Sequence, residues 1–220
     1  KKSIKEFCIR SNNVIFFQNR GSQNQRVERI INLSCFIGEE MSFSLEKKRT
    51  IKRIAQLSKF DLETNMVQEF PELQGVMGEN YAIKKNETTK VSRGIREHYY
   101  PRHSMDSFPK DIEAVIVSIA DKLDFLLVAF SLGKKPTGAA DPFGLRRMAQ
   151  GVIQLVLGLN LHLDLNVLLS KGIFFLDKQQ DLIYDRKKLK IELNEFFIRR
   201  QRWYLQQKGF RYDLIDAVLK

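Results

Sequence analysis

The chain has 220 residues, of which 43% are hydrophobic, so it is long and apolar enough to bury a core. Its 12 glycines and 5 prolines are too few for a disordered linker or a turn-rich β-sandwich, and they favour helices. Lys and Arg number 37 against 26 Asp and Glu, and the formal charge of +11 attracts polyanions such as nucleic acids.

Residues 1–23 are predicted to form an N-terminal segment ahead of one helical domain over residues 24–220. The domain begins with a helix, because apolar side chains recur there at three- and four-residue spacing. That helix places on one face Val27, Ile30, Ile31 and Cys35.

A second helix is predicted to begin at a cap formed by Ser42 or Ser44 and to continue until Pro71 stops it. This helix carries Asp61, and a turn between Pro71 and Gly78 and then a short helix through Tyr81 follow it. Its apolar positions are Ile51, Ile54, Ala55, Leu62 and Met66.

The middle of the chain predicts two more helices. The first spans residues 89–100, carries His98 and is ended by Pro101. Pro109 suits the first turn of the second, which has a long apolar stripe. Two carboxylates interrupt that stripe, Asp121 and Asp124.

The last third is predicted to hold three helices. Asp141 and Pro142 are an N-cap and first-turn pair for a long buried helix. A short helix after Asp164 is predicted to end at Gly172, where an apolar turn follows. Residues 185–207 have the pattern of an amphipathic basic helix.

The helical layout resembles the HD superfamily of metal-dependent phosphohydrolases, in which a distant His, a His-Asp pair and a later Asp converge on a divalent ion. Ala120-Asp-Lys-Leu-Asp124 resembles the late aspartate helix, and Ser58-Lys-Phe-Asp-Leu62 stands where the His-Asp pair would be. Position 60 is Phe, and no His precedes His98, so no metal site is predicted. A degenerate pocket would consist of Asp61, His98, Asp121 and Asp124. The favoured interpretation is that each of them caps a helix, pairs with a basic residue or is solvated.

Four longer strings follow one another along the chain. They are Asp61-Leu-Glu-Thr-Asn-Met-Val-Gln-Glu-Phe-Pro-Glu-Leu-Gln-Gly-Val-Met-Gly78, Glu97-His-Tyr-Tyr-Pro-Arg102, Ala120-Asp-Lys-Leu-Asp124 and Pro136-Thr-Gly-Ala-Ala-Asp-Pro-Phe-Gly-Leu-Arg-Arg147. In sequence and order they resemble the β subunit of the tetrameric, bacterial-type glycyl-tRNA synthetase. Three positions depart from the family pattern: Ala139-Ala140 replaces a Ser-Lys pair, and Gly144 replaces Ala.

This resemblance implies an all-α, HD-domain-like helical bundle that takes part in ATP-dependent attachment of glycine to tRNA(Gly). In the family, the α subunit activates glycine with ATP and Mg, and the β subunit chiefly binds tRNA. The implied partners are therefore the α subunit and tRNA(Gly), with no catalytic residue and no cofactor in this segment. Most of the signature is interpreted as architectural, with Phe70 and Phe143 as core aromatics.

Two basic clusters are the candidates for tRNA contact, because guanidinium groups bind phosphates and aromatic rings stack on bases. They are Arg199, Arg200, Arg202, Trp203 and Lys208 in the first cluster, and Arg146 and Arg147 in the second. Two competing interpretations are that Trp203 packs inward while the arginines are solvated, and that the second cluster pairs with carboxylates.

Two other functions stay open at this level: a degenerate HD-family phosphohydrolase and a pure assembly module. The two cysteines, Cys8 and Cys35, are too few for a disulfide framework and favour a reducing compartment. No apolar run is long enough for a bilayer, so no membrane partner is expected. A bacterial cytoplasm or a plastid stroma fits these features.

Overall fold

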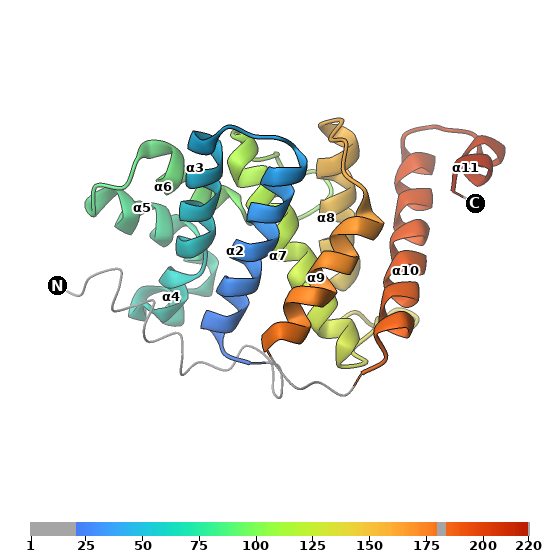
Figure 1. The fold of residues 1–220 in the computed structure, drawn as a ribbon, viewed down its shortest axis with the longest axis horizontal. Helices are drawn as coiled ribbons and strands as arrows, with labels where there is room; N and C mark the ends of the chain where they lie inside the picture. Colours follow the sequence, from blue (N-terminus) through green and yellow to red (C-terminus); the bar gives the residue numbers. More distant parts are fainter. Residues whose placement is uncertain (1–20, 180–183, 220) are drawn as a thin grey trace.

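The computed structural model describes residues 21–179 and 184–219, and this part of the chain is all α with no strand (Figure 1). The predicted all-α class is confirmed. The α-helices are α2 (Gln23–Glu40), α3 (Leu45–Leu57), α4 (Asn65–Glu69), α5 (Val76–Lys84), α6 (Thr89–Glu97), α7 (Ile112–Ser131), α8 (Leu145–Gly158), α9 (Leu165–Gln179), α10 (Arg186–Gln207) and α11 (Tyr212–Val218). Two 3-10 turns, η1 (Phe60–Glu63) and η2 (Pro71–Leu73), flank α4.

Helix α7 is the central element of the fold. Nearly all of its side chains are buried, as expected of a helix that is apolar on most of its circumference. It packs against α2, α3, α6, α8, α9 and α10. In Figure 1 it runs behind α2 and α9, while α10 and α11 form the end of the molecule that holds the C terminus. Every other long helix is therefore positioned relative to α7.

Local caps explain several helix starts. Ser44 caps α3, because its Oγ accepts a hydrogen bond from the Lys47 N–H at 3.4 Å. Asp185 caps α10 in the same way, through the Lys188 N–H at 3.0 Å. The predicted Ser44 cap and the predicted helix over 185–207 are thus confirmed.

The prediction of one continuous second helix up to Pro71 was wrong. Helix α3 ends at Leu57, and Asp61 lies on η1 instead of an α-helix. Thr64 starts the separate helix α4, because its side chain accepts the Val67 N–H. Phe60 turns into the core and is 3% exposed, so the break serves core packing.

Four further boundaries differ from the predictions. Helix α6 ends at Glu97, and α7 begins at Ile112, beyond the segment that contains Pro109. Helix α8 begins at Leu145 instead of Pro142, because Gly144 adopts a left-handed φ of 65°. Helix α9 continues through the predicted stop at Gly172 to Gln179.

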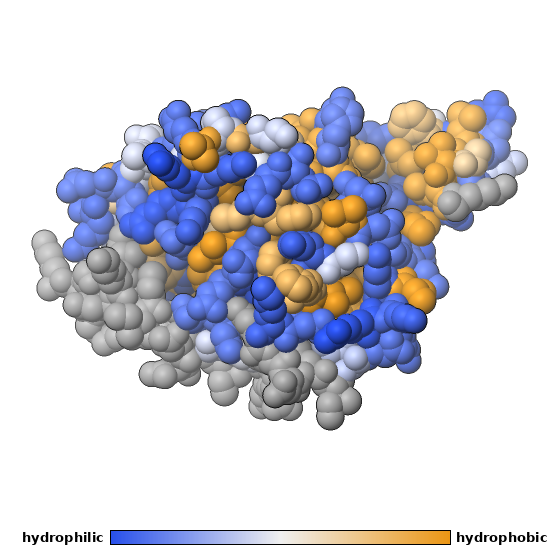
Figure 2. Space-filling model, viewed as in Figure 1, coloured by the Kyte–Doolittle hydropathy of each residue, from blue (hydrophilic) through white to orange (hydrophobic). Residues whose placement is uncertain are grey.

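The predicted core aromatics Phe70 and Phe143 are also wrong, since they are 46% and 36% exposed. Apolar side chains lie at the surface of α11 too, including Tyr212, Leu214 and Val218. Figure 2 shows this as orange at the end of the molecule that holds the C terminus. No helix of the described residues has the length and apolarity needed to cross a membrane. The proposed N-terminal segment lies almost entirely outside the described residues, so the domain division stays a prediction.

Candidate nucleic-acid interface

A buried lysine joins two of the four residues of the predicted degenerate pocket. The Lys59 ammonium donates hydrogen bonds to His98 Nε2 at 2.8 Å and to Asp121 Oδ2 at 2.7 Å. It also lies 4.0 Å from the centre of the Tyr99 ring. Arg26 donates to the second oxygen of Asp121 at 2.9 Å. His98 and Asp121 are therefore held together by a side chain from a third segment.

The hydrogen bonds fix the charge state of this cluster. His98 Nδ1 donates to the Ile95 carbonyl at 2.7 Å, which leaves Nε2 to accept from Lys59. Burial and the neighbouring Lys59 ammonium hold the pKa of His98 well below its usual value. Burial lowers the pKa of Lys59 to about 8, although Asp121 opposes this shift. Burial alone would raise the pKa of Asp121, but Lys59 and Arg26 outweigh it and lower that pKa.

The other two predicted pocket residues have separate roles. Asp61 Oδ2 accepts from the backbone N–H groups of Gly75 at 2.7 Å and Gly78 at 3.2 Å, so it holds the turn before α5. Burial raises the pKa of Asp61. Asp124 accepts two hydrogen bonds from Arg29 on α2. Among the described residues, no three His, Cys, Asp or Glu side chains gather closely enough to hold a metal ion.

The neutral His98 predicts a specific acid sensitivity. A histidine whose folded pKa lies below about 6.5 takes up a proton on unfolding, so stability is lost as pH falls below that value. The loss amounts to about 1.4 kcal/mol per pH unit. We expect His98→Gln to remove this slope from the free energy of unfolding measured by denaturant titration between about pH 6.5 and pH 5. The exposed His103 is the matched control, and an equal change of slope in His103→Gln would contradict the assignment.

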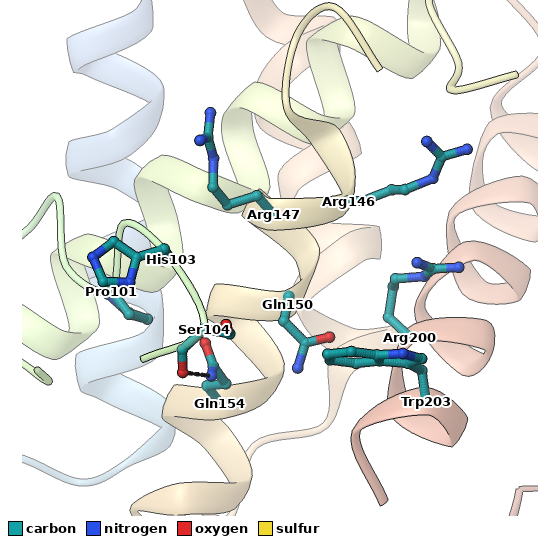
Figure 3. Close-up of a pocket in the computed structure, with 9 residues that line it drawn as sticks. All are labelled: Pro101, His103, Ser104, Arg146, Arg147, Gln150, Gln154, Arg200 and Trp203. Carbon is teal, nitrogen blue, oxygen red and sulfur yellow. Dashed lines mark hydrogen bonds between the residues drawn. The ribbon is translucent and has the colours of Figure 1, made fainter. Parts of the chain in front are cut away.

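A basic groove lies between α8 and α10. It forms a cavity of about 280 Å³. Figure 3 shows its lining residues, which come from the loop after α6 and from the two helices. They are Pro101, His103, Ser104, Arg146, Arg147, Gln150, Gln154, Arg200 and Trp203. The groove thus unites the predicted Arg146 and Arg147 cluster with two members of the predicted α10 cluster.

The three arginines of the groove concentrate positive charge. Asp141 accepts the Leu145 and Arg146 backbone N–H groups, so it caps α8 and is not an ion-pair partner of these arginines. Arg146, Arg147 and Arg200 form no ion pair with any carboxylate in the described part of the chain. Burial and the nearby Arg146 guanidinium lower the pKa of Arg200. The Arg146 guanidinium donates to the Gly138 carbonyl at 2.6 Å, and Asp141 partly offsets the lowered pKa of Arg200. The groove keeps an excess of positive charge, which favours an anion.

Trp203 lies at the side of the groove formed by α10 and is 42% exposed, so it does not pack inward. Gln150 is 8% exposed, and its amide nitrogen has no hydrogen-bond partner among the described residues. In Figure 3 its side chain lies between α8 and Trp203. Gln154 donates to the Ser104 carbonyl at 2.8 Å, which ties the loop to α8.

The buried Lys122 of α7 binds the backbone of the loop after α6, which forms one wall of the groove. Its ammonium donates to Ser118 Oγ at 2.7 Å and to the Tyr100 carbonyl at 3.1 Å, immediately before Pro101. Burial lowers the pKa of Lys122 to about 7. The loop wall of the groove is thus attached to the central helix α7.

The remaining members of the predicted α10 cluster lie away from the groove. Arg199 is 3.9 Å from Glu195, and Arg202 pairs with Asp216 of α11 at 3.0 Å. Lys208 is exposed beside Tyr204. Of the predicted α10 cluster, only Arg200 and Trp203 line the groove between α8 and α10, while Arg199 and Arg202 line a neighbouring cavity along α10 together with them.

Sequence reasoning missed Gln150, Gln154 and Lys59. The two glutamines could have been found from the sequence, because Arg146, Gln150 and Gln154 are four residues apart and therefore share one helix face. Lys59 had none, because its partners are distant in the sequence.

The chain is similar to proteins of known assignment over its whole length. A family model described as glycyl-tRNA synthetase beta subunit matches residues 1–220. A glycine–tRNA ligase beta subunit from Halalkalibacterium halodurans is 40% identical over 219 residues, which cover 100% of this chain and 32% of that protein. One from Trichodesmium erythraeum is 40% identical over 221 residues, covering 99% of this chain and 30% of that protein. The chain spans about a third of the length of the curated relatives it matches.

Proposed function

The chain belongs to the glycyl-tRNA synthetase β-subunit family, and from that membership we propose that it is a tRNA-binding and structural part of a glycine–tRNA ligase β subunit. In this role it supports ATP-dependent attachment of glycine to tRNA(Gly) together with an α subunit. ATP and Mg act in the α subunit, and this segment supplies no catalytic residue. The proposed place of work is a bacterial cytoplasm or a plastid stroma.

One observation carries the tRNA-binding role. Three arginines without carboxylate ion pairs among the described residues line the same groove as an exposed indole, and the Arg200 side chain lies nearest to the ring in Figure 3. Arginines bind phosphates through charge-assisted hydrogen bonds, and a half-exposed aromatic ring offers a face to a base. Other exposed arginines form ion pairs, as Arg211 does with Asp213. RNA binding explains why the groove keeps its positive charge unpaired.

Charge reversal in the groove tests the proposal. We expect Arg146→Glu/Arg200→Glu to weaken tRNA(Gly) binding at least about tenfold, because two phosphate contacts become repulsive. The slope of log affinity against log salt should fall by about two. Filter binding or fluorescence anisotropy with the β subunit over a series of salt concentrations measures both quantities.

The control is Arg49→Glu/Lys52→Glu, two exposed positions on α3. Both double variants change the net charge equally, so long-range attraction falls equally in both. If the α3 variant loses as much affinity as the groove variant, the groove is not the binding site. A β subunit that assembles with the α subunit and binds no tRNA would be the pure assembly module.

A further inference from the structure

We infer that the groove between α8 and α10 binds an unpaired nucleotide of the RNA, with its base stacked on Trp203 and its phosphate held by Arg146 and Arg200. This inference rests on the proposed function and narrows it from tRNA in general to an unpaired position. It also gives Gln150 a role in contacting the edge of the base.

The first support is the exposure of the indole. Trp203 is the only tryptophan of the chain, and 42% of it is exposed at a cavity lined by cations. Figure 3 views the ring edge-on, with Arg200 on one side of its plane and the Gln150 amide beside its edge. That side is where a flat base can lie against the ring, with cations beside it for the phosphate.

The second support is the set of polar atoms that lack partners. Arg200 Nε and Gln150 Nε2 are buried and have no hydrogen-bond partner among the described residues. A buried donor without a partner costs free energy, so an occupant that accepts hydrogen bonds is favoured at both atoms. A phosphate oxygen accepts from a guanidinium, and the edge of a base both accepts from and donates to an amide.

The third support is the shape and lining of the cavity. A cavity of about 280 Å³ has room for a small flat ligand, and its walls are the loop at Pro101, α8 and α10. Bases within an RNA duplex are stacked on one another, so their faces are covered and cannot reach Trp203. An unpaired base has both faces free. The groove therefore favours a single-stranded or looped position over a helical stem.

The single tryptophan provides the test. The β subunit is titrated with a short single-stranded oligoribonucleotide and, separately, with the blunt duplex that this strand forms with its complement. Because the remainder of the β subunit can contain further tryptophans, Trp203→Leu identifies the signal by difference. We expect the single strand to quench the Trp203 fluorescence and the duplex to leave it unchanged. Trp203→Leu should weaken single-strand binding by about fivefold or more, in line with the loss of one stacked base.

Trp203→Phe keeps a smaller aromatic face, so it should bind the single strand more tightly than Trp203→Leu. If Trp203 had only a structural role, the affinity would not depend on whether the replacement is aromatic. Thermal unfolding of both variants should match the parent, because Trp203 is outside the core. Suppose that Arg146→Glu/Arg200→Glu abolishes tRNA binding while Trp203→Leu binds the single strand normally. The inferred stacking of a base on Trp203 is then wrong, and the proposed tRNA-binding function stands. If neither variant affects binding, both fail. Equal quenching by duplex and single strand would also overturn the inference.

Discussion

Replacing Arg29 with Met should lower the free energy of unfolding by about 3–5 kcal/mol, because it leaves a buried carboxylate without its partner. Arg29 Nε lies 2.6 Å from Asp124 Oδ1, and a second guanidinium nitrogen lies 3.2 Å from Oδ2. The two side chains are 2% and 4% exposed, so water cannot replace the lost contact. Chemical denaturation followed by circular dichroism measures the change.

The double variant Arg29→Met/Asp124→Leu distinguishes the contribution of the ion pair from that of the packing of the Arg29 side chain. Removing both charges avoids a lone buried ion, so the double should be more stable than Arg29→Met. A double variant as unstable as the single would show that the aliphatic part of Arg29 contributes most of the effect. Because this pair joins α2 to α7, it also supports the helix against which the groove is built.

Replacing Gly94 with Ala should destabilise the protein by about 2–3 kcal/mol, although Ala is the better helix former. A Cβ at this position of α6 would lie 2.5 Å from Ile54 Cδ1 and 2.9 Å from Ile54 Cγ1. Ile54 is fully buried in α3, so it has no free space in which to move. Helices α3 and α6 would have to separate. Thermal or chemical unfolding measures the loss.

Ile54→Val removes Cδ1, the atom nearest to the added methyl group, and therefore completes a double-mutant cycle with Gly94→Ala. On its own it should cost about 0.5–1.5 kcal/mol. In combination with Gly94→Ala it should cost less than the sum of the two, because the overlap is relieved. Strict additivity, or a stabilising Gly94→Ala, would show that α6 shifts freely and that the close approach is unimportant.

Much of the fold was predictable because helix formation is decided by local patterns. The starts at Ser44 and Asp185 depend on a side chain and a backbone N–H three residues later, so they are visible in the sequence. The break after Leu57 was not, because Phe60 leaves the helical path to reach the core. The predicted helix end at Gly172 was wrong as well. In α9 this glycine permits the close approach of Leu127 of α7, and the helix continues through it.

The sequence by itself determined the all-α class, the family and the two basic clusters, because apolar periodicity, motif strings and charge are properties of neighbouring residues. Tertiary structure alone decided which of these residues meet. Lys59 lies between His98 and Asp121 only because η1, α6 and α7 pack together. Arg146 and Gln150 face Arg200 and Trp203 because α8 packs against α10 across some fifty residues of chain. The faces that two helices present to each other depend on how both pack on α7, and no local pattern in the sequence encodes that choice.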